Sequence, residues 1–135
     1  MLHLDHANKM LRMSTKDFNA LTGMLNHPEH FSDEVFGFHA QQAIEKASKA
    51  WLDLLKVEYR RIHDIGELFN LLRLNGQQIP LEFLELQDLT DYAVDYRYEP
   101  LESDDPSINR REIIDKVNNF IGFVRQKVSD EEKNE

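Results

Sequence analysis

Apolar side chains recur at helical spacing along most of the chain. Between residues 4 and 25 they repeat every seven positions, at Leu4, Leu11, Phe18 and Leu25. Between residues 36 and 57 the spacing alternates between four and three, and most of the positions are alanines: Phe36, Ala40, Ala43, Ala47, Ala50, Leu54 and Val57. These spacings place side chains on one face of an α-helix. The pattern therefore predicts two long helices, and the alanine seam of the second predicts that another helix approaches it closely.

The rest of the chain predicts three more helices. Asp64 and Glu67 have the spacing of a capping box for a helix over residues 65–74. Pro80 marks a fourth start, and Asn109 a fifth. The apolar stripes of these last two helices are Leu86, Leu89, Ala93 and Tyr96, and then Ile113, Val117, Phe120, Val124 and Val128. We therefore expect an all-α fold, an up-and-down antiparallel bundle of about five helices over residues 1–128, with residues 129–135 as a polar, disordered tail.

Composition narrows the class of protein. The chain has 135 residues, enough for one domain, and no cysteine, which excludes disulfides and thiolate chemistry. Its start does not have the pattern of a signal peptide, and no run of residues is long and apolar enough for a membrane span, so a soluble, cytoplasmic protein without a membrane partner is expected.

The charge is concentrated in one segment. The net charge is -9, and residues 65–105 hold ten acidic against two basic side chains. An acidic surface repels phosphate backbones, so DNA is not expected as a partner, whereas a basic protein would suit it. The alternative is a solvated face that keeps the domain soluble.

A polar stripe runs along the second predicted helix beside the alanine seam. Its members are spaced three and four apart: His39, Gln42, Lys46, Lys49 and Asp53. A stripe in this position lies at the rim of a groove, where polar groups can meet a ligand or a partner. The alternative is an ordinary helix edge, with Glu45 and Lys49 as an ion pair one turn apart.

Two further places carry candidate chemistry. His63 precedes the third helix, and the N-terminal end of a helix favours anions. Its imidazole could transfer protons or contact a phosphate. The alternative is a side chain that is simply packed before the helix cap. Arg97 and Tyr98 end the fourth helix, and an arginine among tyrosines can bind phosphate or stack on a base. Arg97 can equally cap the C-terminal end of the helix or form an ion pair with Asp95.

Well-known catalytic and metal motifs are absent from the sequence. There is no glycine-rich phosphate loop, no Gly-x-Ser-x-Gly and no His-Glu-x-x-His. His3 and His6, like His27 and His30, are three residues apart, but no third ligand is evident for either pair. We therefore expect no metal and no resident cofactor, and no single motif specifies a reaction.

Three segments together resemble the HEPN domain family. The run from Phe38 to Ala50, FHAQQAIEKASKA, resembles the signature helix of that family. His63-Asp64-Ile65 followed by Leu68 resembles the start of its third helix, and residues 89–98, LTDYAVDYRY, resemble the end of its fourth. The segments occur in the family's order, and the resemblance covers residues from about 4 to 128.

The resemblance implies a helical bundle that often forms homodimers. Many members are encoded beside a minimal nucleotidyltransferase and work with it as a two-component module, often of toxin–antitoxin type. Nucleotide binding, for instance of ATP, was the role first proposed for the domain, and several branches are metal-independent ribonucleases that act on RNA. Those nucleases carry an arginine, four to six residues, then a histidine.

The sequence departs from the family in two informative places. Arg60 and Arg61 are too close to His63 for the nuclease motif, and no histidine follows Arg97, so the motif is not matched. Ser48 replaces a residue that is usually apolar, which predicts that this side of the helix is partly exposed.

We expect a shared site to gather side chains from three helices: His39, Gln42, Lys46, Lys49, His63, Asp64, Arg97 and Tyr98. The leading hypothesis is a nucleotide-binding or partner-binding component, in which the cations neutralise phosphates and a tyrosine ring stacks on a base. A second is a dimeric endoribonuclease with His63 and Arg97 as catalytic candidates. A third is a purely structural dimer, in which the same cluster is a buried polar network with Glu45 or Asp64 as counter-charge.

Overall fold

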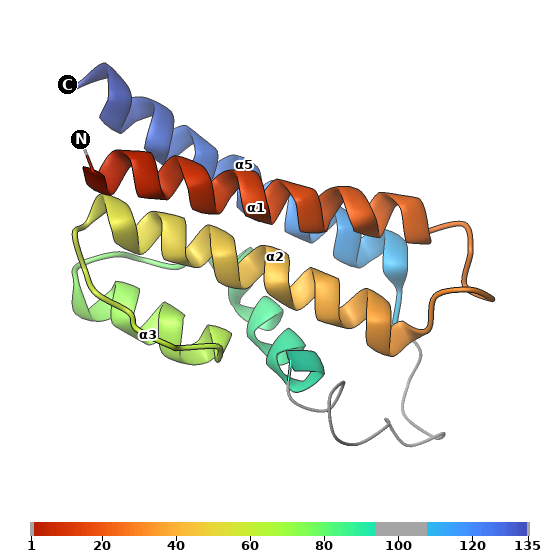
Figure 1. Cartoon of the computed structure of the whole chain (residues 1–135). Coiled ribbons are helices and arrows are strands. Elements are labelled where there is room, and N and C mark those ends of the chain that lie inside the picture. The colour runs from red at the N-terminus through yellow and green to blue at the C-terminus, as the bar shows by residue number, and fades with distance from the viewer. Residues whose placement is uncertain (1, 94–107, 135) are drawn as a thin grey trace.

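Five helical segments make up the described part of the fold (Figure 1). The computed structural model describes residues 2–93 and 108–134. The elements are α1 (Leu2–Met24), α2 (Asp33–Leu54), α3 (Ile65–Leu74), a 3₁₀-helix η1 (Leu81–Leu89) and α5 (Arg110–Lys133). All regular structure in these residues is helical, so the predicted all-α bundle is confirmed. None of these helices is long and apolar enough to cross a lipid bilayer.

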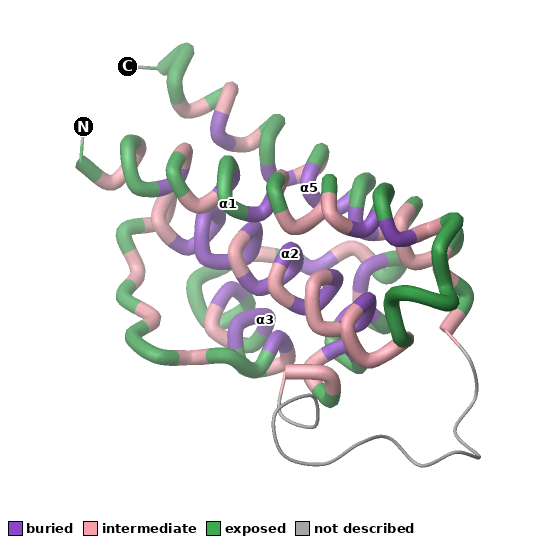
Figure 2. The backbone as a smooth tube through the Cα atoms, turned by 45° about the vertical axis from the view of Figure 1, so that its right-hand side comes forward, coloured by how far each residue is buried: buried purple, intermediate pink, exposed green. Residues whose placement is uncertain are grey.

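Helix α2 is the central element of the bundle. It packs against α1, α3, η1 and α5, and Figure 2 shows buried positions along most of its length. The alanine seam is buried, since Ala40, Ala43, Ala47 and Ala50 are all 0% exposed. The Ser14 hydroxyl of α1 donates a 2.6 Å hydrogen bond to the carbonyl oxygen of Ala43. The small side chains thus let α1 reach the backbone of α2, as the seam predicts.

The helix starts follow from local side-chain chemistry. The Asp64 carboxylate accepts a hydrogen bond from the Glu67 amide at 3.2 Å, and the Asn109 side chain accepts one from the Glu112 amide at 3.1 Å. Both caps agree with the sequence prediction. Ser32 caps α2 in the same way, through the Val35 amide at 3.2 Å. Helix α3 ends at Leu74, as the sequence predicts, and Gly76 follows it with a φ of 84°.

The fourth helix begins after Pro80, as predicted, but its first part, Leu81–Leu89, is a 3₁₀-helix, and α-helix follows over residues 90–93. Phe83, Leu86 and Leu89 are buried and are spaced by three residues, which matches the three residues per turn of a 3₁₀-helix. The same repeat places the exposed carboxylates of Glu82, Glu85 and Asp88 in one row, which we call the acidic edge of η1. The predicted helix is therefore present, but its first nine residues are 3₁₀-helical rather than α-helical. The predicted stripe members beyond residue 93 lie outside the described residues.

The predicted disordered tail is also wrong for residues 129–133, because α5 continues to Lys133. Val128 is 2% exposed and ties the last turns to the core. The Gln126 side chain donates to the Asp130 carboxylate at 2.9 Å, and Asn8 of α1 donates to Glu132 at 3.4 Å. Polar composition alone had suggested disorder, but these contacts stabilise the helical end.

A glycine on α2 makes room for an aromatic side chain beside η1. A Cβ atom at Gly37 would lie 2.4 Å from two ring carbons of Tyr92. Because those carbons belong to a rigid ring, the whole side chain would have to move. Gly37 is therefore a packing requirement at the junction of α2 and the segment after η1.

We expect Gly37→Ala to lower the free energy of unfolding by about 1–3 kcal/mol, the usual cost of overpacking. Without the clash, alanine would instead stabilise a helix interior by about 1 kcal/mol. The same substitution in a Tyr92→Ala background should therefore be neutral or stabilising. Urea denaturation of the four proteins measures the change of sign; equal effects in both backgrounds would contradict this packing argument.

Candidate functional site

The polar stripe of α2 is present in the structure, but carboxylates of the same chain pair with its basic side chains. Asp17 of α1 lies between two of them, with Oδ2 2.7 Å from Lys46 Nζ and Oδ1 3.1 Å from His39 Nδ1. This ion-paired group fastens α1 to α2. The sequence did not point to Asp17, because it lies on a different helix.

A second, more buried group lies around Glu45. Lys49 Nζ is 2.9 Å from Glu45 Oε2, and the side chains are only 9% and 5% exposed. Gln41 donates from its amide nitrogen to Glu45 Oε1 and to the carbonyl oxygen of His63, both at 2.9 Å. Gln42 donates to Gln41 Oε1 at 2.7 Å. We call these residues, together with His63, the Glu45 network.

His63 and Asp64 lie at the start of α3 and have different roles. His63 Nδ1 lies 3.2 Å from Glu45 Oε2, while the side chain is 66% exposed. The Asp64 carboxylate caps α3 by accepting the hydrogen bond from the Glu67 amide. Thr90 accepts a hydrogen bond from the Ile65 amide at 2.9 Å, which joins the start of α3 to the segment after η1. Glu45, rather than Asp64, is thus the counter-charge of this cluster.

The structure gathers Lys49 and His63 around the buried carboxylate of Glu45, with Gln42 joined to them through Gln41. It gathers His39 and Lys46 around the half-buried carboxylate of Asp17. Arg97 and Tyr98 lie outside the described residues. Each described cation of the stripe is therefore neutralised within the chain, which leaves the stripe without surplus positive charge for a phosphate.

Comparison with known proteins settles the family. The family model of the HEPN domain matches residues 7–128. The chain belongs to the HEPN family. No curated protein and no solved structure matches it.

One expectation about the HEPN signature helix is wrong. Ser48 is 0% exposed, although a polar residue there suggested a partly exposed face. Its hydroxyl has no hydrogen-bond partner among the described residues. Helix α2 of this HEPN domain is covered on that side as well, in agreement with its central place in Figure 2.

A third polar group lies at the C-terminal end of α2 and was not predicted as a site. His6 Nδ1 is 2.7 Å from Asp53 Oδ2, and the Tyr59 hydroxyl donates to Asp53 Oδ1 at 2.9 Å. Burial raises the pKa of Asp53, although hydrogen bonds from His6 and Tyr59 act in the opposite direction. Lys49 Nζ lies 5.6 Å from the Tyr59 ring centre, so this group adjoins the Glu45 network. It joins α1 and the segment after α2 to the HEPN core.

The Tyr59 phenol gives the HEPN domain a testable alkaline response. Burial, and then the charge and hydrogen bond of Asp53, raise the pKa of Tyr59 well above its usual 10.0. Above pH 10 the unfolded chain loses the phenolic proton while the native chain keeps it, so the free energy of unfolding falls as pH rises. The loss from this group is at most about 1.4 kcal/mol per pH unit.

We expect Tyr59→Phe to remove this part of the pH dependence, so that its stability falls less steeply than that of the wild-type protein between pH 10 and 11. All other ionisable side chains are the same in both proteins, so their contributions cancel in the comparison. Urea denaturation at several pH values measures it. Parallel curves would contradict a perturbed Tyr59.

No group of three or more potential metal ligands occurs within residues 2–93 and 108–134. His6 is instead bound to Asp53, and His27 and His30 each lie within 4 Å of Glu29, at 3.6 and 3.7 Å. In the described part of this HEPN domain, neither histidine pair has the third ligand that a metal site would require.

Proposed function

We propose that this chain is the partner-binding component of a two-component, toxin–antitoxin-type module, and that its partner is a minimal nucleotidyltransferase. Membership of the HEPN family supports the proposal, because the family resemblance implies such pairing. The observation that favours partner binding over nucleotide binding at the predicted site is the pairing of Lys46 with Asp17 and of Lys49 with Glu45. Phosphate binding there would require breaking these ion pairs.

The acidic edge of η1 is the surface that we assign to the partner. Its three carboxylates, Glu82, Glu85 and Asp88, are exposed, and Glu85 pairs with Lys116 of α5. Like charges in one row favour a partner with a basic surface and accelerate its association. The net charge of -9 acts in the same direction.

The test is to co-express the chain with a minimal nucleotidyltransferase from the same genome and to separate the products by size-exclusion chromatography. A complex that forms at micromolar concentration supports the proposal, and separate elution of the two proteins contradicts it. The charge-reversed variant Glu82→Lys, Asp88→Lys should bind at least about tenfold more weakly at low salt. The matched control is Glu29→Lys, Glu58→Lys, which reverses two exposed carboxylates on loops.

The ribonuclease alternative retains one supporting observation. An exposed imidazole held by a buried carboxylate, as in His63 and Glu45, is an arrangement suited to a general base. Its proposed companion Arg97 lies outside the described residues. Cleavage of RNA in EDTA that disappears in His63→Ala would support this alternative, and intact RNA with both proteins would contradict it.

The homodimer remains a separate proposal. The alanine seam is fully buried inside one chain, against α1, so it is not the surface that would join two copies. Sedimentation at several concentrations would distinguish a stable dimer from a monomer.

A further inference from the structure

A groove lies where α3, η1 and α5 meet, and the function proposed above does not use it. Its volume is about 1000 Å³. All three helices and the loop between α3 and η1 contribute to its lining, with Arg73, residues 76–80, Leu81, Leu84, Phe123 and Lys127. We call it the α3–η1–α5 groove. Its described lining contains two basic side chains and no acidic one.

The 3₁₀ geometry of η1 gives this groove an apolar wall. With three residues per turn, the side chains of η1 fall into three rows. One row is buried in the core and another is the acidic edge. The third row begins with Leu81 and Leu84, which line the groove, and Leu81 is 85% exposed. The groove is therefore apolar on η1, although the acidic edge belongs to the same helix.

Aromatic rings, rather than a carboxylate, hold Lys127 in place. Its Nζ lies 4.9 Å from the ring centre of Trp51 and 4.8 Å from that of Phe123. The two rings pack edge to face with their centres 5.3 Å apart, and the Trp51 indole donates to the Gln77 side chain at 3.2 Å. Such contacts fix the position of the ammonium group but leave its charge available.

Arg73 is the second basic side chain of the groove. Its guanidinium donates a 2.8 Å hydrogen bond to the side-chain oxygen of Asn70, which is neutral. Within the described ranges neither Arg73 nor Lys127 has a carboxylate partner, on a chain whose net charge is -9. The cations of this groove therefore differ from Lys46 and Lys49 of the α2 stripe, which are ion-paired within the chain.

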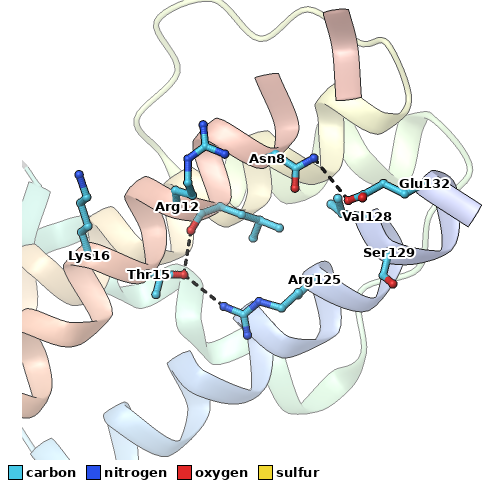
Figure 3. A pocket seen from close by; sticks show the side chains of 9 residues that line it. Asn8, Arg12, Thr15, Lys16, Arg125, Val128, Ser129 and Glu132 are labelled. Atoms are coloured by element: carbon cyan, nitrogen blue, oxygen red, sulfur yellow. Dashed lines mark hydrogen bonds between the residues drawn. The ribbon is translucent and has the colours of Figure 1, made fainter. Parts of the chain in front are cut away.

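A second groove, between α1 and α5, lacks this arrangement. Figure 3 shows that the side chains of Arg12 and Lys16 do not converge with Arg125. The Thr15 hydroxyl, to which Arg125 donates at 3.2 Å, itself donates to a backbone carbonyl of α1. Glu132 adds a carboxylate to the lining. Basic residues of this second groove are therefore suitable controls.

We propose that the α3–η1–α5 groove binds an acidic peptide segment of a partner protein, in which an apolar side chain is flanked by carboxylates. The apolar side chain covers Leu81 and Phe123, and the carboxylates meet Arg73 and Lys127. Exposed apolar surface beside charged groups is typical of protein interaction sites. Because the rest of the chain is acidic, the two cations restrict such a segment to this groove.

The shape and charge of the groove favour a peptide over other ligands. With Leu81 so exposed, a ligand has to cover a surface rather than enter a cavity, and small-molecule sites are usually enclosed. A nucleic acid would extend beyond the two cations and meet the acidic edge of η1. The acidic edge and the groove are assigned to partner surfaces of opposite charge, so either proposal can fail without the other.

The test begins with the selection of short random peptides, displayed on phage, on the immobilised whole chain at low salt. Sequences with a leucine or an aromatic residue between aspartates or glutamates should be enriched. The enriched peptide is then synthesised with a fluorescent dye, and its affinity is measured by fluorescence anisotropy. Rising NaCl should weaken its binding, because the groove is exposed.

Leu81→Ala and Arg73→Glu should each weaken binding of the enriched peptide by about tenfold, through lost apolar contact and lost charge-assisted hydrogen bonds. Both side chains are exposed, so the variants should keep the wild-type melting curve. The matched controls are Leu2→Ala and Arg12→Glu, at exposed positions of α1, which contributes no residue to the described lining. Their affinities should equal that of the wild-type protein.

Three results would overturn the proposal. The first is a selection that enriches no sequence, or that enriches basic sequences. The second is an affinity that Leu81→Ala and Arg73→Glu leave unchanged, or that the control variants lower equally. The third is displacement of the peptide by a short single-stranded RNA that binds more tightly, which would assign the groove to a nucleic acid.

Discussion

Replacing Glu45 with alanine is expected to lower the free energy of unfolding by about 3–5 kcal/mol, the usual cost of removing one member of a buried ion pair. Lys49 would keep its charge in a place where its side chain is only 9% exposed and would lose its 2.9 Å partner. The Gln41 amide would lose one of its two acceptors, and His63 would lose the carboxylate near its ring. Urea denaturation followed by circular dichroism measures the loss.

The double variant Glu45→Leu, Lys49→Met separates the cost of an unpaired charge from the value of the pair itself. Each single substitution leaves one buried group without its partner, whereas the double variant removes both charges. We expect it to recover most of the stability, because apolar residues often replace buried ion pairs at little cost. Glu58→Ala, at an exposed loop carboxylate, should change stability by less than about 0.5 kcal/mol.

These outcomes bear directly on what the Glu45 network does. If Glu45→Ala barely changed stability, Lys49 would be free to meet an external anion, and the nucleotide-binding hypothesis at α2 would regain its support. If the expected loss is observed, Lys49 is committed to the fold, and a phosphate ligand has to bind elsewhere.

Much of the fold could be predicted because its signals are local. The alanine seam, the caps at Asp64 and Asn109 and the stop at Gly76 depend on residues within one or two turns of each other. The 3₁₀-helix η1 was missed because apolar residues three apart fit an α-helix almost as well over two turns. The helical end of α5 was missed because its support comes from a contact with α1, between Asn8 and Glu132.

The candidate site was predicted in part for the same reason. Spacing along α2 predicted the polar stripe, which the structure divides between Asp17 and the Glu45 network, and the resemblance added His63. What spacing cannot supply is the partner from another helix, and Asp17, which neutralises Lys46, is 29 residues away in sequence. The His6–Asp53 contact spans 47 residues, and no pattern in either segment indicates it. Such partners determine whether a cation can bind a ligand or is used in the fold.

Arg110 makes long-range contacts that we expect to contribute strongly to stability. Arg110→Ala should lower the free energy of unfolding by about 3 kcal/mol. Its side chain is 9% exposed and ion-paired to Asp33 at 3.0 Å, and it also donates to the carbonyl oxygens of Met24 and Phe31. Its guanidinium lies 5.0 Å from the ring centre of Phe36. The start of α5 is thereby fastened to the end of α1 and the start of α2.

The neighbouring Arg111 provides the matched control for this substitution. It is exposed, it belongs to the same first turn of α5, and its removal changes the net charge by the same amount. Arg111→Ala should therefore stay within about 0.5 kcal/mol of the wild-type protein. Arg110→Lys keeps the charge but cannot reach three acceptors with a planar fork, so it should recover less than half of the loss.

Equal effects of Arg110→Ala and Arg111→Ala would mean that charge at the N-terminus of α5, rather than the buried hydrogen bonds, accounts for the stability. Full recovery in Arg110→Lys would reduce the role of Arg110 to a point charge beside Asp33.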